Sequence, residues 1–247
     1  MRPFLTWVPL LLLAWGCATG PEEARTPTLG DADLRVVFVG NSLTFVNDVP
    51  ALVQALAEAD GRSMAHLSLV AGNFSLEDHW YAGAPGILRE LAADVVVLQQ
   101  GPSSLPENRA HLIRWSQRFA DVIREAGGEP ALYMVWPSAD RMSAFPEVWT
   151  SYRLAADSAG GAFVPAGQTW VEAWALDGTL PFYGDDGFHQ SYLGALAAAE
   201  TLYAVLFDVP ADSVPDLADT VSPEIREIVR AGLAESLRLA GYGAAPD

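Results

Sequence analysis

Short apolar runs alternate with segments of helical periodicity along most of this chain. Such runs, several of them rich in β-branched residues, are typical of buried strands in a parallel sheet. They occupy residues 34–39, 66–70, 94–99, 131–135 and 162–165. Helical periodicity predicts helices at residues 50–60, 106–126, 146–159, 168–176, 191–207 and 222–240, with shorter pieces at 75–80 and 85–92. Five strands that alternate with helices predict an α/β domain in which right-handed crossovers cover both faces of one parallel sheet.

The first apolar run leads into the sequence Gly40-Asn41-Ser42-Leu43-Thr44, and a helix signal with Asn47, Asp48 and Pro50 follows. Ser42 is therefore predicted in a tight strand-to-helix turn at the carboxyl end of a strand. Ligands bind at this edge of open α/β sheets. A small hydroxyl close to backbone N–H groups is suited to act as an activated nucleophile. The alternative is a serine that only caps the turn, which an isolated G-x-S motif favours.

Composition narrows the class of protein. The chain has 247 residues, of which 51% are hydrophobic and 18% charged, as expected for one globular domain with a full core. The formal net charge is −17, and no run of basic residues interrupts the acidic surplus. A nucleic-acid backbone is therefore not expected as a partner.

The N-terminal segment has the pattern of an export signal. Arg2 precedes an apolar stretch from Phe4 to Trp15, and Gly16-Cys17-Ala18 follows. This stretch is short for a membrane span and fits a secretory signal peptide. Cys17 at the expected cleavage point resembles the lipobox of bacterial lipoproteins. That resemblance implies lipidation of Cys17 and membrane contact only through this anchor, whereas the alternative is a plain signal peptide cut nearby.

These signals divide the chain into three parts. Residues 1–17 are expected to be the signal peptide, and residues 18–30, which lack an apolar period, a flexible tether. Residues 31–243 are expected to form the functional domain. Its predicted location is the bacterial cell envelope, outside the cytoplasm.

A second motif supplies the groups that would activate a serine. Asp186-Gly187-Phe188-His189 lies just before the Ala-rich helix and is expected at the same edge of the sheet as Ser42. A histidine can take a proton from a hydroxyl, and a carboxylate on its other nitrogen fixes the tautomer. D-x-x-H alone is a weak signal, but with Ser42 it forms a candidate Ser-His-Asp triad.

Four motifs together resemble those of the SGNH (GDSL-type) hydrolase superfamily: Gly40 to Thr44, Gly72, the turn from Gln99 to Ser104, and Asp186-x-x-His189. Their order and spacing match the family, and the resemblance covers roughly residues 33–208. It implies a flavodoxin-like three-layer α/β/α sandwich with a five-stranded parallel sheet in the order 2-1-3-4-5. It also implies ester hydrolysis through a serine nucleophile.

Carried over position by position, the resemblance makes Ser42 the nucleophile, His189 the base and Asp186 the orienting acid. The backbone N–H groups of Ser42 and Gly72 would supply the oxyanion hole. Asp185 competes with Asp186, but only Asp186 has the family's spacing to His189.

The third oxyanion donor departs from the family pattern. The family uses an Asn in a G-x-N-D turn, whereas this chain has Gly101-Pro102-Ser103-Ser104. By alignment Ser103 takes the Asn position, although the amide of Gln99 or Gln100 could reach the same spot, and we favour Gln100. Asn41 also replaces the usual Asp before the nucleophile. Losing one oxyanion donor typically costs ~10²–10³ in rate. Without a replacement donor, a slower enzyme than the family pattern implies is expected.

The remaining candidates concern substrate binding. Asn41, Asn73 and Trp136 are the predicted substrate contacts, Trp136 because an aromatic ring just past a strand end could stack on a sugar. His79 is either part of a second site or a residue lining a helical turn near the pocket or the surface, and His111 is expected on a helix surface. No Cys/His cluster or HExxH pattern points to a metal, and no cofactor is expected.

The sequence therefore predicts an exported serine esterase that cleaves a small ester, with a carbohydrate ester as one candidate substrate. One alternative is a lipoprotein that keeps the fold and binds a glycan without turnover. Another is a flavodoxin whose Ser42 loop cradles a flavin phosphate, which export and the loop composition disfavour. An α/β-hydrolase elbow is also disfavoured, because Thr44 stands where G-x-S-x-G needs its last glycine.

Overall fold

The computed structural model describes residues 28–217 and 221–243 and contains a five-stranded parallel sheet. Its strands run in the order β2-β1-β3-β4-β5, which confirms the expected topology and fold class. They are β1 (Leu34–Gly40), β2 (Met64–Val70), β3 (Val95–Leu98), β4 (Glu129–Tyr133) and β5 (Ala162–Val164). In these two stretches no helix is long and apolar enough to span a membrane.

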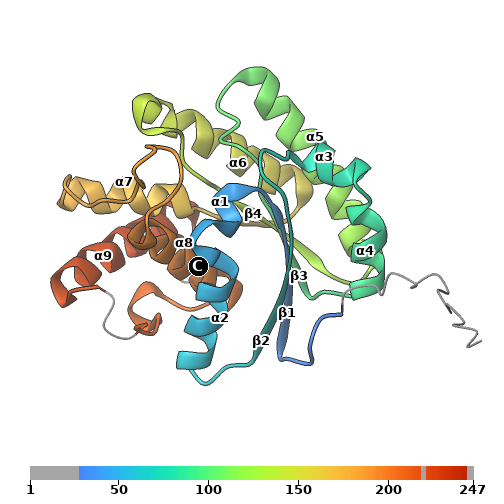
Figure 1. Cartoon of the computed structure of the whole chain (residues 1–247), viewed down its shortest axis with the longest axis horizontal. Coiled ribbons are helices and arrows are strands. Elements are labelled where there is room, and N and C mark those ends of the chain that lie inside the picture. Colours follow the sequence, from blue (N-terminus) through green and yellow to red (C-terminus); the bar gives the residue numbers. More distant parts are fainter. Residues whose placement is uncertain (1–27, 218–220, 244–247) are drawn as a thin grey trace, which may run out of the picture.

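Helices cover both faces of the sheet (Figure 1). One layer contains α2 (Val49–Ala59), α7 (Ala166–Leu176), α8 (Tyr192–Leu206) and α9 (Pro223–Ala240). The other contains α3 (Leu76–Tyr81), α4 (Ala84–Leu91), α5 (Pro106–Glu125) and α6 (Phe145–Ala159). The described residues also contain short elements: α1 (Ser42–Phe45) and the 3-10 turns η1 (Val46–Asp48), η2 (Ala139–Ala144) and η3 (Ala211–Ser213).

The central strands lack the alternation of apolar and polar residues that a half-exposed sheet shows, and the sheet is buried on both faces. Four consecutive residues of β1, Val36 to Val39, have no exposed surface, as expected for a strand between two helical layers. Helix α5 instead shows the 3.6-residue pattern of a surface helix, and Leu112, Phe119 and Ile123 are among its buried residues. The two helical layers thus hold the carboxyl ends of the strands in fixed positions.

The segment after β1 differs from expectation. A helical turn begins at Ser42 itself, whereas the sequence predicted a helix start only near Asn47, Asp48 and Pro50. Asn47 and Asp48 adopt left-handed backbone angles, with φ of 55° and 46°, and separate α1 from α2. Asn and Asp tolerate this conformation better than most residues. The kink allows Ser42 to occupy the first position of its own short helix.

Candidate active site

Ser42 is held at the start of α1 by an N-cap. The Oδ1 atom of Asn41 accepts a hydrogen bond from the N–H of Leu43 at 3.1 Å, and its Nδ2 donates to the carbonyl of Phe74 at 3.0 Å. As the first residue of a helix, Ser42 has no intrahelical acceptor for its own N–H. Ser42 therefore lines the cavity at the first position of its helix, with an N–H that has no intrahelical partner.

The side chain of Gln99, directly after β3, fixes this turn from the neighbouring strand. Its Oε1 accepts hydrogen bonds from the Asn41 N–H and the Thr44 hydroxyl, both at 2.8 Å, and its Nε2 donates to Asn41 Oδ1 at 3.0 Å. Gln99 has no exposed surface. Its amide therefore positions the turn. Of the two glutamines considered as the third oxyanion donor, this leaves Gln100.

Gly40 allows this close packing. A Cβ atom at Gly40 would lie 2.5 Å from both Gln99 Oε1 and Thr44 Oγ1, so a side chain there would displace the amide or the hydroxyl. The Gly40 carbonyl accepts hydrogen bonds from the N–H of Ala71 at 3.2 Å and from the buried His79 ring at 2.7 Å. The first of these ties the turn that contains Gly72 to the end of β1.

A cavity of about 410 Å³ opens beside Ser42. Two aromatic rings and a proline contribute to its wall, together with polar side chains from the turn after β2, the turn after β3 and the first half of α5. The lining residues are Asn41, Ser42, Asn73, Phe74, Ser75, Gln100, Gly101, Pro102, Ser103, Asn108, His111 and Phe188. None of them is an Arg, Lys, Asp or Glu, so the cavity wall is polar but without a permanently charged group.

The turn after β3 brings both remaining candidates for the third oxyanion donor to this cavity. Gln100 Nε2 donates to Ser103 Oγ at 2.9 Å, and Gln100 Oε1 accepts from the N–H of Leu76 at 3.2 Å. The buried Tyr152 hydroxyl, on α6, donates to the Gln100 carbonyl at 2.6 Å. Ser103 adopts φ of 55°. The turn is thus internally bonded, and the Gln100 amide keeps a second N–H beyond the one given to Ser103.

The predicted base and acid lie in direct contact. His189 Nδ1 is 2.5 Å from Asp186 Oδ2, and Asp186 Oδ1 accepts the N–H groups of Phe188 and His189 at 2.9 Å each. The hydrogen bond from His189, followed by the two from the backbone, lowers the pKa of Asp186 to about 2. Asp186 is therefore ionised at any physiological pH, and His189 Nε2 is left free for chemistry.

Contacts on either side of His189 join its loop to the Ser42 turn. Phe188 lines the same cavity as Ser42. The Nε2 atom of the buried Gln190 donates to the carbonyl of Val46 at 2.6 Å and to that of Leu43 at 3.3 Å. Among the hydrogen bonds of residues 28–217, none joins the Ser42 hydroxyl to His189, a contact that often tightens only when substrate is bound.

The predicted substrate contacts have different surroundings. Asn73, with φ of 62°, lies exposed at the cavity wall. Asn41 also lines the cavity, but its side chain is bonded within the turn. The prediction for Trp136 was wrong: its ring has no exposed surface, stacks on Trp170 with centroids 3.8 Å apart, and donates to the Phe188 carbonyl at 3.1 Å. Trp136 therefore supports the His189 loop from inside the core and cannot stack on a sugar.

Two histidines have surroundings that the sequence did not reveal. His111 lies on α5 with a partly exposed side chain, and it also lines the Ser42 cavity. His79 is 4% exposed and packs edge-on against Phe74, with its Nε2 at the Gly40 carbonyl. Desolvation by burial lowers the pKa of His79, so this ring acts as a neutral donor that positions the end of β1.

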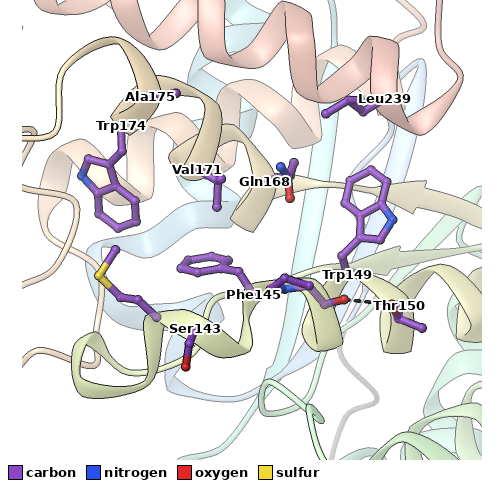
Figure 2. Close-up of a pocket in the computed structure, with 11 residues that line it drawn as sticks. Ser143, Phe145, Trp149, Thr150, Gln168, Val171, Trp174, Ala175 and Leu239 are labelled. Carbon is purple, nitrogen blue, oxygen red and sulfur yellow. Dashed lines mark hydrogen bonds between the residues drawn. The ribbon is translucent and has the colours of Figure 1, made fainter.

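A second cavity, of about 890 Å³, lies between α6 and α7 and contains no predicted site residue. Figure 2 shows Phe145 and Trp149 projecting from α6 and Val171 and Trp174 from α7. The Thr150 hydroxyl there donates to the carbonyl of Pro146 at 2.8 Å. Because no titratable side chain lines this cavity, the Ser42 cavity is the candidate site for chemistry.

Cys17 lies outside the described residues. Within residues 28–217 and 221–243, no cluster of three or more His, Cys, Asp or Glu side chains could hold a metal ion.

The parallel sheet and the Ser42 turn at its carboxyl edge give the chain the fold of the SGNH hydrolases. No family model and no curated protein matches the sequence. The fold assignment therefore rests on the solved structures.

Solved structures align over most of the chain. A DUF4886 family protein from Bacteroides uniformis matches with a TM-score of 0.72 at 17% identity, over 89% of this chain and 98% of its own. A protein from Slackia heliotrinireducens described as an SGNH hydrolase matches with a TM-score of 0.59 at 22% identity, over 71% and 100%. An acetylxylan esterase from Geobacillus stearothermophilus matches with a TM-score of 0.54 at 14% identity, over 72% and 95%. At these identities the matches show a shared fold.

Proposed function

We propose that this protein is a serine ester hydrolase in which Ser42, His189 and Asp186 form the catalytic triad. The observation that carries the proposal is the His189–Asp186 pair in a loop bonded to the Ser42 turn through Gln190. The pair occupies Nδ1 of His189 and leaves Nε2 free, which is the arrangement that a serine nucleophile requires. Structural neighbours that are esterases and acylhydrolases support the same class of reaction.

In the proposed reaction, Ser42 Oγ attacks the ester carbonyl carbon and its proton passes to His189 Nε2. The C–O bond to the alcohol then breaks, the alcohol takes the proton from His189, and the acyl group remains on Ser42. A water molecule, deprotonated by His189, releases the acid and restores the serine. Asp186 remains ionised throughout and stabilises the imidazolium.

The negative charge of the tetrahedral intermediate requires hydrogen-bond donors. The N–H groups of Ser42 and Gly72 are the proposed backbone donors. Gln100 Nε2 is the proposed third donor, with Ser103 as the group that orients it at 2.9 Å. Preorganised donors of this kind typically contribute about 3–4 kcal/mol each to the transition state.

The size and polarity of the cavity favour a short acyl group and a polar alcohol. About 410 Å³ is at the lower end of ligand pockets, and the wall is rich in amide and hydroxyl groups. The acetylxylan esterase among the structural neighbours acts on a carbohydrate ester, which supports a carbohydrate ester as the candidate substrate here. A glycan-binding protein without turnover is the alternative.

Hydrolysis of p-nitrophenyl acetate and labelling by a fluorophosphonate probe test the proposal. Wild type should turn over the ester and become labelled, and Ser42→Ala should lose both. Ser104→Ala is a matched control, because Ser104 lies just past the cavity turn and does not line the cavity. Turnover that survives Ser42→Ala undiminished would contradict the mechanism, and a folded wild type without turnover would favour the glycan-binding alternative.

We also propose that the chain is exported and lipidated at Cys17, on the basis of the apolar segment and the lipobox-like sequence alone. Intact-mass analysis of membrane-extracted protein should show a chain that starts at Cys17 and carries acyl groups. A mature chain that starts well after Cys17 would rule out the anchor.

A further inference from the structure

A second histidine–carboxylate pair lies at the wall of the Ser42 cavity. His111 Nε2 is 2.8 Å from Glu77 Oε2, and the two residues come from neighbouring helices, α5 and α3. The side chain of His111 retains 29% exposure, and His111 lines the cavity together with Ser42. The proposed triad does not use either residue.

The Glu77 carboxylate fixes the tautomer of the neutral His111 ring. A carboxylate only accepts hydrogen bonds, so the Nε2 atom of His111 must carry the proton. In the neutral ring Nδ1 is then an acceptor, and it has no hydrogen-bond partner among the described residues. Trp115, one helical turn further along α5, packs against the ring with centroids 6.2 Å apart and restricts its orientation. The pair thus leaves the Nδ1 acceptor of the neutral ring unoccupied, on a residue that lines the cavity.

The neighbours of His111 indicate what this acceptor would meet. Asn108, three residues earlier on α5, lines the same cavity and adds an amide. Phe74 and Phe188 supply apolar ring surfaces, and no Arg or Lys lines the wall. An anionic ligand would find no Arg or Lys at the wall and would lie near the Glu77 carboxylate. A neutral ligand with hydroxyl groups and a C–H face would satisfy the amide, the acceptor and the rings together.

We propose that His111, oriented by Glu77, accepts a hydrogen bond from a hydroxyl of the ester's alcohol portion and makes the site selective for neutral polyhydroxylated esters. This inference rests on the proposed hydrolase function and assigns its specificity to one residue pair. His111 acts on substrate choice, while the bond-breaking steps belong to Ser42 and His189.

The test compares two acetyl esters that share an acyl group and differ in the alcohol: a mono-acetylated methyl glucoside and p-nitrophenyl acetate. The measured quantity is the ratio of their kcat/KM values. His111→Phe keeps a ring but removes the acceptor, and this ratio should fall by about tenfold, the value of one hydrogen bond. His111→Gln, which restores an acceptor, should recover part of the ratio. Glu77→Ala should lower it in the same direction.

His66→Phe is the matched control, because His66 lies on β2 and its Nδ1 contacts Gln54 away from the cavity. This variant should keep the wild-type ratio. A ratio that changes by less than about threefold in His111→Phe would overturn the inference while leaving the hydrolase function intact. A ratio that is not recovered at all by His111→Gln would also overturn it, because the loss would then reflect packing.

If wild type hydrolyses neither ester, the proposed hydrolase function fails, and equilibrium binding still decides the role of His111. Titration calorimetry with methyl glucoside would then compare wild type with His111→Phe. Weaker binding by the variant supports a hydroxyl contact at His111. Equal binding, or none to wild type, overturns it.

Discussion

The backbone nitrogen of Asn41 lies 2.8 Å from the side-chain oxygen of Gln99, so the end of β3 holds the turn that carries Ser42. Gln99→Ala removes this bond and those to Thr44 and Asn41 Oδ1, and leaves a buried N–H without a partner. We expect a loss of about 2–4 kcal/mol in the free energy of unfolding, measured by urea denaturation. Gln54→Ala on α2 removes bonds to the exposed Glu58 and to the partly buried His66, and it should cost less than about 1 kcal/mol. Equal losses in the two variants would contradict this role for Gln99.

Asp186 is expected to matter less than the two residues that handle the reacting proton. Asp186→Ala leaves a histidine and a nucleophile in place, so kcat for p-nitrophenyl acetate should fall on the order of 10⁴, against roughly 10⁶ for Ser42→Ala or His189→Ala. The double variant Ser42→Ala/His189→Ala should be no slower than either single variant. Since the pKa of Asp186 is lowered to about 2, protonation of Asp186 should not limit activity above about pH 4. Additive losses would show that the residues do not act as one unit.

The fold was accessible from the sequence because its signals are local. A short apolar run such as residues 94–99 has few conformational alternatives once it is buried. The observed strand β3 (Val95–Leu98) lies within this run. The order of the strands came from the family resemblance, since periodicity carries no information on which strands are neighbours. The start of α1 was missed because the left-handed residues Asn47 and Asp48 resemble a helix cap in sequence.

The site was accessible only in part, because several of its contacts are between residues far apart in the chain. Ser42, Asp186 and His189 could be named from short motifs, and the Asp186–His189 contact is local. The contacts of Gln99 and His111 depend on which helix and strand end meet at the cavity, which no spacing reveals. The direction in which Trp136 points depends on Trp170, 34 residues later, and its stack could not be foreseen.

Burial of His79 should make the protein less stable in mild acid. Desolvation lowers the pKa of His79, so the unfolded chain binds a proton near pH 6.5 that the folded chain does not. The free energy of unfolding should therefore decrease as the pH falls below about 6.5 and through the folded pKa. His79→Phe, which cannot titrate, should reduce this slope in chemical denaturation between about pH 7 and 5. Some slope should remain from His66, whose pKa is also lowered by burial. An unchanged slope would contradict the assignment.

The buried Glu200 on α8 should produce the opposite trend. Burial raises the pKa of Glu200 to about 7, opposed by Arg230 and Arg226 and reinforced by Asp216, and one carboxyl oxygen has no hydrogen-bond partner. The folded chain then holds a proton that the unfolded chain loses near pH 4.5, so stability falls as the pH rises from about 4.5 to 7. Glu200→Gln should be more stable than wild type at pH 8, by on the order of 2–3 kcal/mol in thermal denaturation.

Glu172→Gln on α7 is a suitable control, because that side chain is only partly buried and already accepts a hydrogen bond from Gln168. It should change the stability at pH 8 by no more than about 0.5 kcal/mol. A Glu200→Gln variant less stable than wild type at pH 8 would indicate that the ionised carboxylate is satisfied by Arg230.

The hydrogen bond from Gln190 to the Leu43 carbonyl spans 147 residues. During synthesis the Ser42 turn leaves the ribosome long before the segment that carries His189, and a truncated chain would contain the proposed nucleophile without its proposed base. Closing so long a loop is slow relative to local helix formation. The onset of ester hydrolysis in a refolding experiment should therefore lag behind the recovery of helical signal. A time course of activity would therefore report completion of the fold. A chain that ends before His189 should not hydrolyse esters.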